Sequence, residues 1–400
     1  MKVAVIGGGA SGVIAALKAS EHADVILIEG NNKIGKKILI TGNGKCNFWN
    51  KVIDTTKYNS NNLSFLNGLL ARQDEVYNFL TKTLGITPTE KNGYIYPRSK
   101  TASSLSEALS RALNNRNVDI LYNLKVKHIK ISDNAIILSL SDNTELKVDK
   151  VIVATGSKAV SKTGSDGSGY DLLKALGVKI VPVTPALVPL KISDDEKKLW
   201  LGVRCDAKLT IIKDDKQTKE ERGEIQLTDY GISGIVTFNI SSLVSNLLIN
   251  HDKININIDF IPEIDNLENF FEEKNRYMNA PTIEELLETI FNYKLLQAIL
   301  RRADLKKEMK WSNLNIEEKG KLINAIKNFQ VDVIGTEDYD KAQVCRGGVS
   351  LSEIDNTFSL KTNKNIKVIG EILDVDGKCG GYNLAFAFIS GYIAGDEIND

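Results

Sequence analysis

Three glycines near the start of the chain have the spacing of a dinucleotide-binding turn. Gly7, Gly9 and Gly12 form the pattern Gly-x-Gly-x-x-Gly, directly between the apolar run 2–6 and a helix predicted over 10–19. In such a turn the first glycine permits the sharp bend, the second lets the backbone approach a pyrophosphate, and the third lets helix pack on strand. The N-terminus of the helix then offers free N–H groups to the anion.

A carboxylate follows at the distance from the glycine turn that ribose binding requires. Glu29 ends the next apolar run, 24–29, about 20 residues after Gly9. A carboxylate at this position accepts hydrogen bonds from ribose hydroxyls and disfavours a 2′-phosphate. The sequence therefore predicts a βαβ unit that binds FAD or NAD rather than NADP.

The far end of the chain contains a second strand, glycine turn and apolar helix, in the segment 368–395. Gly370 allows close backbone approach, and Glu371 has a carboxylate for the ribityl or pyrophosphate part of a cofactor. Gly380 and Gly381 open a helix whose N-terminus stabilises the negative charge that reduction places on a flavin. NAD would leave this second turn without a partner, so the two ends together favour FAD.

The elements between the two ends indicate an α/β fold with insertions. Short strands separated by polar turns are predicted over 118–148, and a helix over 74–83. Short segments at 186–192, 205–213, 223–228, 234–241 and 256–262 read as strands of a β-barrel, and helices are expected at 267–277, 283–291, 294–303 and 316–329. We predict a Rossmann-like FAD-binding domain formed by both chain ends, 1–185 and 331–400, with an inserted β-barrel-like domain, 186–265, and a small helical domain, 266–330.

Five motifs carry a resemblance to a known family. They are "VAVIGGGASG", "GKKILITGNGKCN", "VIVATG", "GGV" at 347–349 and "GEILDVDGKCGGYNLAFAFISGYIAG". The chain resembles, nearly end to end, the BaiN-type family of FAD-dependent oxidoreductases, also labelled aminoacetone-oxidase-like. The resemblance implies a glutathione-reductase-like FAD fold with an inserted β-barrel and helical domain. It also implies that the backbone of Val126 meets the adenine and that six residues lie along the flavin: Lys36, Lys37, Thr41, Gly42, Asn43 and Gly44. Arg346 departs from the family pattern, since a small residue is expected before the Gly-Gly-Val.

The glycine turns and the resemblance together give the expected cofactor-binding residues. They are Gly7, Gly9, Ala10, Ser11, Gly12, Glu29, Gly30, Lys36, Lys37, Thr41, Gly42, Asn43, Gly44, Asn47, Val126, Ala154, Thr155, Gly156, Gly348, Gly370, Glu371, Asp376, Gly380, Gly381, Tyr382 and Asn383.

Catalytic residues are less clearly indicated. The expected set is Tyr96, Arg98 and Cys46: Tyr96 as a proton donor, Arg98 as a site for an anionic or carbonyl-bearing substrate, and Cys46 as a second donor. Tyr94 and Tyr382 are further candidate donors. The alternative is that the tyrosines pack on a loop beside a solvated Arg98 and that the thiols are buried and inert.

Composition narrows the function further. Lysine plus arginine equal aspartate plus glutamate, 51 each, which disfavours nucleic acid and anionic membranes as partners. The four cysteines show no paired spacing, so a reducing, cytoplasmic location is expected. No histidine and cysteine cluster has the spacing of metal ligands, so no metal is predicted.

The chemistry is therefore assigned to the flavin. We expect hydride transfer between flavin N5 and a small or hydrophobic organic substrate, leaning to a reductase of enone C=C bonds that uses NADH or NADPH. No second Gly-x-Gly-x-x-Gly follows a strand, so the nicotinamide would bind only transiently. An amine oxidase that produces hydrogen peroxide is the alternative. A tRNA-modifying flavoprotein and a non-enzymatic flavin redox sensor are less favoured.

Overall fold

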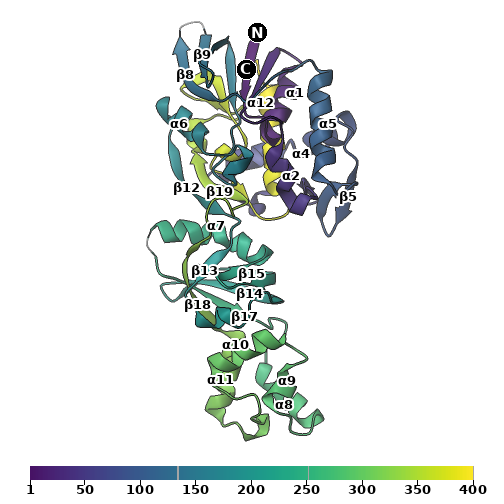
Figure 1. Cartoon of the computed structure of the whole chain (residues 1–400), viewed down its shortest axis with the longest axis vertical. Helices are drawn as coiled ribbons and strands as arrows, with labels where there is room; N and C mark the ends of the chain where they lie inside the picture. The colour runs from purple at the N-terminus through teal and green to yellow at the C-terminus, as the bar shows by residue number, and fades with distance from the viewer. Residues whose placement is uncertain (133–134, 251, 400) are drawn as a thin grey trace. The chain divides into compact units, whose positions relative to one another are not determined.

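The computed structural model describes residues 1–132, 135–250 and 252–399, and it divides the chain into two units (Figure 1). The first unit contains Met1–Pro185 and the chain from Tyr339 onward, so both termini belong to it, and the second is Ala186–Asp338. The predicted return to the cofactor domain at residue 331 is wrong, because Phe329–Thr336 forms a strand of the second unit. The predicted barrel and helical segments fall within that one unit.

A six-stranded sheet forms the centre of the first unit, in the order β20-β21-β11-β1-β2-β7. Every pair is parallel except β20 with β21, and β1 lies between β11 and β2, where Val5 is paired with Ile152 and Leu27. Both faces of β1 are covered, so its apolar run does not alternate with polar residues. The strands are β1 (Lys2–Ile6), β2 (Asp24–Glu29), β7 (Asp119–Tyr122), β11 (Lys150–Val153), β20 (Ser359–Leu360) and β21 (Asn363–Val368).

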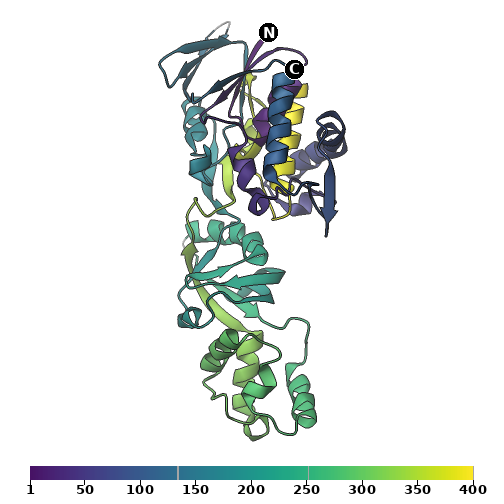
Figure 2. The same cartoon turned by 45° about the vertical axis from the view of Figure 1, so that its right-hand side comes forward.

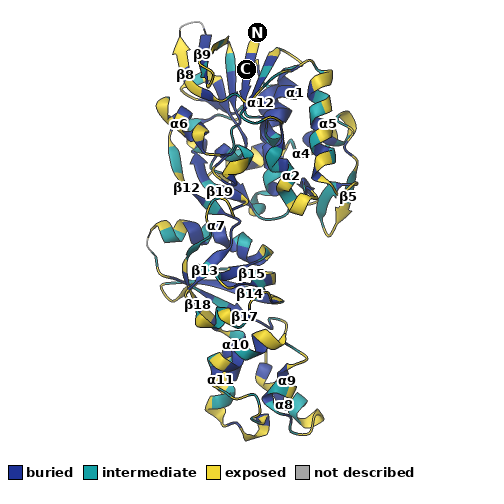
Figure 3. Cartoon of the chain, in the orientation of Figure 1, coloured by how far each residue is buried: buried dark blue, intermediate teal, exposed yellow. Residues whose placement is uncertain are grey.

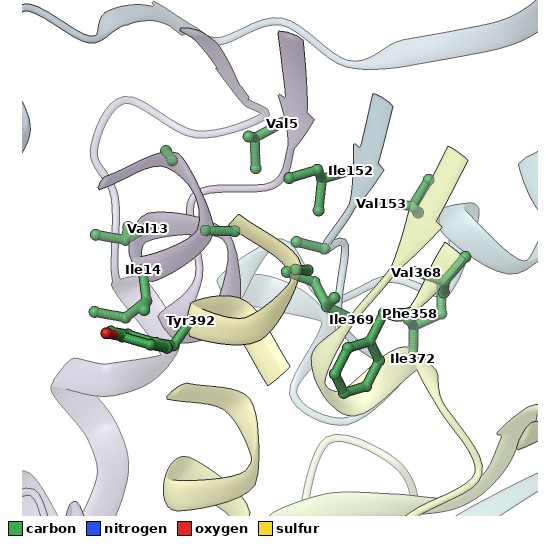
Figure 4. Close-up of a cluster of buried hydrophobic side chains, with 14 of the residues drawn as sticks. Val5, Val13, Ile14, Ile152, Val153, Phe358, Val368, Ile369, Ile372 and Tyr392 are labelled. Carbon is green, nitrogen blue, oxygen red and sulfur yellow. The ribbon is translucent and has the colours of Figure 1, made fainter. Parts of the chain in front are cut away.

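Helices from the two chain ends pack directly on each other beside this sheet. They are α1 (Ala10–Ala19) and α12 (Tyr382–Asp396), drawn side by side in purple and yellow (Figures 1 and 2). A Cβ at Gly391 would lie 2.3 Å from the Ser11 carbonyl oxygen, so only glycine permits this approach. Figure 4 shows buried side chains from these helices and the neighbouring strands, among them Val13, Ile152 and Val368. Figure 3 shows how completely these central elements are buried.

Smaller elements complete the first unit. A three-stranded sheet, β10-β9-β8, matches the strands predicted over 118–148, and the helix predicted over 74–83 consists of α4 followed by a π-helical turn. The remaining elements are α2 (Lys36–Ile40), β3 (Trp49–Asn50), β4 (Tyr58–Asn59), α3 (Leu63–Leu70), α4 (Gln73–Asn78), β5 (Pro88–Lys91), β6 (Tyr94–Pro97), α5 (Ala102–Asn115), β8 (Val126–Ser132), β9 (Ala135–Leu140), β10 (Glu145–Val148), α6 (Ser168–Ala175), β12 (Ile180–Ala186), β19 (Val344–Val349) and β22 (Asp376–Gly377).

The second unit is built on a closed barrel in the order β13-β16-β15-β14-β17-β18. The strand predicted over 234–241 is wrong, since this segment begins the helix α7 (Ile235–Ile249). Its buried Val236, Ile240 and Val244 are spaced by four, so the apolar pattern is helical although its first residues are β-branched. The barrel strands are β13 (Leu190–Ile192), β14 (Arg204–Lys213), β15 (Lys216–Leu227), β16 (Gly231–Ser233), β17 (Ile254–Asp259) and β18 (Phe329–Thr336).

Four helices in the same unit begin within one residue of their predicted starts. Phe329, the first residue of β18, packs against two other buried rings: its ring centroid lies 5.4 Å from that of Trp200 and 5.6 Å from that of Phe260. The helices are α8 (Leu267–Tyr277), α9 (Ile283–Leu287), α10 (Tyr293–Ala303) and α11 (Ile316–Lys327). Among the described residues, none of the helices combines the length and the apolar character that a bilayer crossing requires.

Candidate active site

The N-terminal glycine turn contains two crowded glycines and one open one. Gly7 has φ +106°, and a Cβ on it would lie 2.5 Å from the Ala154 carbonyl oxygen. A Cβ on Gly12 would lie 1.9 Å from the Gly7 carbonyl oxygen, so this residue sets the distance between helix and strand. A Cβ on Gly9, by contrast, would meet no atom within 4 Å. Gly9 therefore borders open space at the N-terminus of α1, where Ala10 and Ser11 follow and where a pyrophosphate would be held.

Glu29 is buried at the end of β2, and its carboxylate is fixed by three hydrogen bonds. It accepts from the backbone N–H of Gly8 at 2.8 Å, the backbone N–H of Asn31 at 2.7 Å, and the Asn31 side-chain amide at 2.8 Å. The sequence did not single out Gly8 or Asn31. Asn31 also accepts from Lys36 Nζ at 2.9 Å, which ties the Glu29 carboxylate to the lysine-rich segment.

The two chain ends meet between this turn and Gly370. Gly370 has φ +75°, and a Cβ there would lie 2.3 Å from Ser11 Oγ. The neighbouring Glu371 accepts from Lys37 Nζ at 2.8 and 3.0 Å and from the Ser157 hydroxyl. Two residues expected to contact the cofactor are thus paired with each other, so Glu371 orients the Lys37 ammonium.

Two buried polar atoms in this region lack a protein partner. They are Asn47 Oδ1 and Thr155 Oγ1, and both residues belong to the expected cofactor set. A Cβ on Gly381, which precedes α12, would lie 2.2 Å from Asn47 Oδ1, so the amide lies at the start of that helix. Buried polar groups are nearly always hydrogen-bonded. Together with the open space at Gly9, these atoms fit a polar dinucleotide that spans both glycine turns.

The loop after α2 has a left-handed backbone. Gly42, Asn43 and Gly44 all have positive φ, 55°, 53° and 79°, and a Cβ on Gly44 would meet no atom within 4 Å. The Thr41 hydroxyl donates to the Ile38 carbonyl at 2.6 Å. The segment read as a loop in the sequence is thus a short helix followed by a left-handed turn.

Several other residues of the expected cofactor set make hydrogen bonds or close contacts within the protein. Asn383 accepts from the Gly377 N–H and donates to its carbonyl, both at 2.8 Å, and the buried Asp376 accepts from Asn59 at 2.8 Å. A Cβ on Gly348 would lie 2.3 Å from the Ile372 carbonyl oxygen. The remaining expected positions are backbone or packing positions: Gly30 beside the Lys125 side chain, Val126 buried in β8, and Ala154 and Gly156 after β11.

Two tyrosines flank the second glycine turn. A Cβ on Gly380 would lie 2.9 Å from Tyr94 Cε1 and 2.9 Å from Tyr382 Cε2, while the Gly380 carbonyl accepts from Asn50 Nδ2 at 2.9 Å. Burial raises the pKa of Tyr94, and the neighbouring Cys379 and Tyr96 raise it further. Burial, followed by Tyr94, also raises the pKa of Tyr382. Both phenols therefore stay protonated at neutral pH and can donate.

Tyr96 and Arg98 lie farther along the same segment. Tyr96 is half-buried in β6 opposite Thr89, near Tyr94. Arg98 is exposed, its backbone N–H donates to the Thr87 carbonyl at 2.8 Å, and its guanidinium has no ion pair with the residues that the structure describes. Tyr94 and Tyr382, which the expected catalytic set did not include, are thus the phenols in contact with the glycine turn.

The two thiols beside these loops stay protonated at neutral pH. Cys46 is fully buried, and burial raises the pKa of its thiol to about 11. Burial raises the pKa of Cys379 to about 12. We do not retain Cys46 as a proton donor, because its side chain has no exposed surface. Arg346 is half-buried near Asp374. Burial raises the pKa of Asp374, and the arginine offsets only part of this shift.

One cluster of possible metal ligands occurs among the described residues, formed by Glu21, His22 and Asp396. Both carboxylates are already ion-paired: Lys18 Nζ lies 2.6 Å from Glu21 and 3.1 Å from Asp396. Arg72 lies 2.7 Å from Asp396. This cluster is an exposed ion-pair network at the ends of α1 and α12.

Comparison with known proteins identifies the family. Residues 1–397 match the model described as "HI0933-like protein Rossmann domain". The chain belongs to the HI0933-like family. It is 36% identical over 402 residues to the 3-dehydro-bile acid delta(4,6)-reductase of Clostridium scindens, with 98% of each chain covered. It is 26% identical over 402 residues to the ribosomal RNA dihydrouridine synthase of Escherichia coli, with 98% of this chain and 97% of the relative covered.

Solved structures show the same fold at low identity. A flavocytochrome c3 fumarate reductase matches with a TM-score of 0.51, 15% identity, and 99% and 78% of the two chains covered. The 3-ketosteroid delta1-dehydrogenase of Sterolibacterium denitrificans matches with a TM-score of 0.51, 10% identity, and 99% and 98% covered. The family match and these folds confirm the predicted family, the Rossmann-type α/β fold and the class of FAD-dependent oxidoreductases. Because one relative is a ribosomal RNA dihydrouridine synthase, nucleic acid is no longer excluded as a partner.

Proposed function

We propose that this protein reduces a carbon–carbon double bond conjugated to a carbonyl in a small apolar molecule, with NADH or NADPH as a transient electron donor. The observation that carries the proposal is the similarity, at 36% identity over 98% of both chains, to a bile acid delta(4,6)-reductase. The absence of a second dinucleotide fingerprint in the sequence supports a donor that binds and leaves.

The residues at the two glycine turns would hold FAD. Glu29 would bind the ribose, the N-terminus of α1 the pyrophosphate, and Asn47 and the N-terminus of α12 the ring end. The chemistry that FAD supplies when bound is two-electron transfer as a hydride. The Lys37 ammonium is held by Glu371 at 2.8 Å, so this pair adds an oriented donor to the site without a net charge.

Reduction of an enone needs one proton in addition to one hydride. The hydride adds to the β-carbon, the electron pair moves to the carbonyl oxygen as an enolate, and the α-carbon then takes a proton. We assign this proton to the Tyr94 hydroxyl, because Tyr94 is half-buried, contacts the Gly380 turn and stays protonated at neutral pH. Tyr94 is half-buried, so it would then take a proton back from solvent.

The test is an anaerobic titration of the FAD-loaded protein with NADH and then NADPH, following the oxidised flavin band. Prompt bleaching is expected, and addition of 4-androstene-3,17-dione as an enone probe should restore the band without forming peroxide. An oxidase of amines would instead show no bleaching by either nucleotide, bleaching by an amine, and peroxide in air. That result would replace the reductase proposal.

A second function has support from a different observation. Two relatives, from Escherichia coli and Haemophilus influenzae, are ribosomal RNA dihydrouridine synthases at 26% identity over nearly the whole chain. Dihydrouridine arises when the C5=C6 bond of uracil, also conjugated to a carbonyl, is reduced, so one site chemistry serves both substrates. The balance of 51 basic and 51 acidic residues disfavours RNA, and salt-dependent RNA binding would reverse our preference.

We also propose a reducing, cytoplasmic compartment, since all four cysteines are free thiols.

A further inference from the structure

Two carboxylates lie beside the glycine turn that is assigned to the pyrophosphate. Glu29 accepts from the backbone N–H of Gly8 in this turn at 2.8 Å. Glu371 follows Gly370, where a Cβ would lie 2.3 Å from Ser11 Oγ in the first turn of α1. A pyrophosphate at the N-terminus of α1 would therefore have two anions near it. Such anions repel it unless hydrogen-bond donors cover their charge.

The Glu29 carboxylate takes its donors from the neighbouring chain. The backbone N–H of Asn31 bonds to it at 2.7 Å, and the Asn31 side-chain amide bonds to it at 2.8 Å. Asn31 in turn accepts from Lys36 Nζ at 2.9 Å. One asparagine thus covers this carboxylate and connects it to a lysine.

The Glu371 carboxylate takes its donors from two distant segments. Lys37 Nζ donates to its two oxygens at 3.0 and 2.8 Å, and the Ser157 hydroxyl donates to Oε1. An ammonium has three N–H groups, so at least one N–H of Lys37 is left for an acceptor other than Glu371. Ser157 stands to Glu371 as Asn31 stands to Glu29.

The surroundings of Ser157 hold its hydroxyl toward this carboxylate. The side chain is fully buried, its Oγ accepts from the Ala159 N–H at 3.1 Å, and its carbonyl accepts from the Ser165 hydroxyl at 2.9 Å. Burial raises the pKa of the neighbouring Cys345 to about 11, so this group is a neutral thiol at pH 7. Glu371 is the stronger acceptor, because hydrogen bonds to a charged group are shorter and stronger than neutral ones.

We propose that Ser157 is a positioning residue of the cofactor site. Together with Lys37 it covers the charge of Glu371, so that the carboxylate does not repel the cofactor pyrophosphate and a Lys37 N–H can bind it. Ser157 acts through Glu371. The proposal rests on the placement of FAD given above and does not depend on the enone substrate.

The test is the FAD affinity of the full-length apoprotein, measured by quenching of flavin fluorescence. Ser157→Ala should weaken FAD binding about tenfold, because one oxygen of Glu371 loses its donor. The matched control is Ser241→Ala in the second unit, which is also fully buried. The Ser241 hydroxyl accepts from the Val188 N–H at 3.1 Å and donates to the Phe238 carbonyl at 2.8 Å. This variant should lower the urea midpoint about as much as Ser157→Ala and keep the wild-type FAD affinity.

A double-mutant cycle separates positioning from support of the fold. Glu371→Gln removes the charge that Ser157 covers, so adding Ser157→Ala to this variant should change FAD affinity by less than about twofold. A serine that only supports the fold would instead weaken binding by the same factor in both backgrounds, which would overturn the proposal.

Two other results would also overturn the proposal. Wild-type FAD affinity in Ser157→Ala would remove the role of the serine and leave the cofactor site as described. A wild-type protein that does not bind FAD would remove the placement of the cofactor as well. Neither measurement uses an enone, so failure of the proposed reaction would be seen separately, as a protein that binds FAD and does not reduce the enone probe.

Discussion

The substitution Gly9→Ala should weaken cofactor binding without harming the fold. Gly9 has φ −79° and ψ −172°, an extended conformation that alanine adopts without strain, and its Cβ would meet no protein atom within 4 Å. The added methyl therefore enters only the space assigned to the pyrophosphate. Overpacking of this kind costs about 1–3 kcal/mol, which corresponds to FAD binding about 5- to 150-fold weaker.

In the protein without cofactor, Gly9→Ala should raise the free energy of unfolding. At a compatible position, Gly→Ala stabilises by about 0.4–1 kcal/mol through the unfolded chain. The assay is urea unfolding of the apoprotein at 25 °C, together with an FAD titration followed by quenching of flavin fluorescence. The placement of the cofactor is refuted if Gly9→Ala keeps the wild-type FAD affinity.

Two matched variants complete this test. Gly12→Ala places a Cβ 1.9 Å from the Gly7 carbonyl oxygen, so it should destabilise the apoprotein by at least about 1–3 kcal/mol. Gly320→Ala, at an exposed site of α11 with no atom within 4 Å, should stabilise by about 0.5–1 kcal/mol and leave FAD binding unchanged. If Gly9→Ala behaves like Gly12→Ala, the residue serves packing rather than the cofactor.

Three further predictions concern catalysis and titration. Tyr94→Phe should lower kcat for enone reduction about 10²- to 10⁴-fold with flavin reduction by NAD(P)H unchanged, whereas Tyr96→Phe should have a much smaller effect; equal losses would contradict the assignment of the proton donor. The pKa of Asp355 is lowered to about 2 by its hydrogen bonds and ion pair, which outweigh its burial. Its contribution to stability is therefore complete above about pH 4 and is lost as pH falls toward 2. In thermal unfolding, the melting temperature of Asp355→Asn should depend less on pH in that window than the melting temperature of the wild type. Cys46, with a pKa of about 11, should resist iodoacetamide at pH 8 in the folded protein and react at once in urea, and rapid labelling of the native protein would show that its side chain is accessible.

The sequence predicts the cofactor half of this protein well because the relevant constraints are local. The glycine turns need positive φ or close approach at fixed positions, and these requirements appear directly as Gly7, Gly12 and Gly370. The pairing of Lys37 with Glu371 joins residues 334 positions apart, so no local pattern could have shown it. The same is true of Tyr94, which meets Gly380 only through the fold.

The errors in the inserted region also have physical reasons. The segment 234–241 contains β-branched residues, yet it forms the start of α7, because its apolar residues continue at helical spacing through Val244. The strand Phe329–Thr336 alternates buried and exposed residues, as many edge or barrel strands do. Only its pairing with β13 and β17 shows that it closes the barrel rather than opening the return to the cofactor unit.

The most direct test of the central claim is a single-turnover experiment. The FAD-loaded protein is reduced anaerobically with one equivalent of dithionite and mixed with 4-androstene-3,17-dione, while the oxidised flavin band and the reduced steroid are followed together. We predict that the band returns at the rate at which one equivalent of saturated ketone forms, and that Tyr94→Phe slows both equally. A flavin that stays reduced with the enone and is reoxidised only by oxygen, with formation of peroxide, would contradict the assignment as an enone reductase.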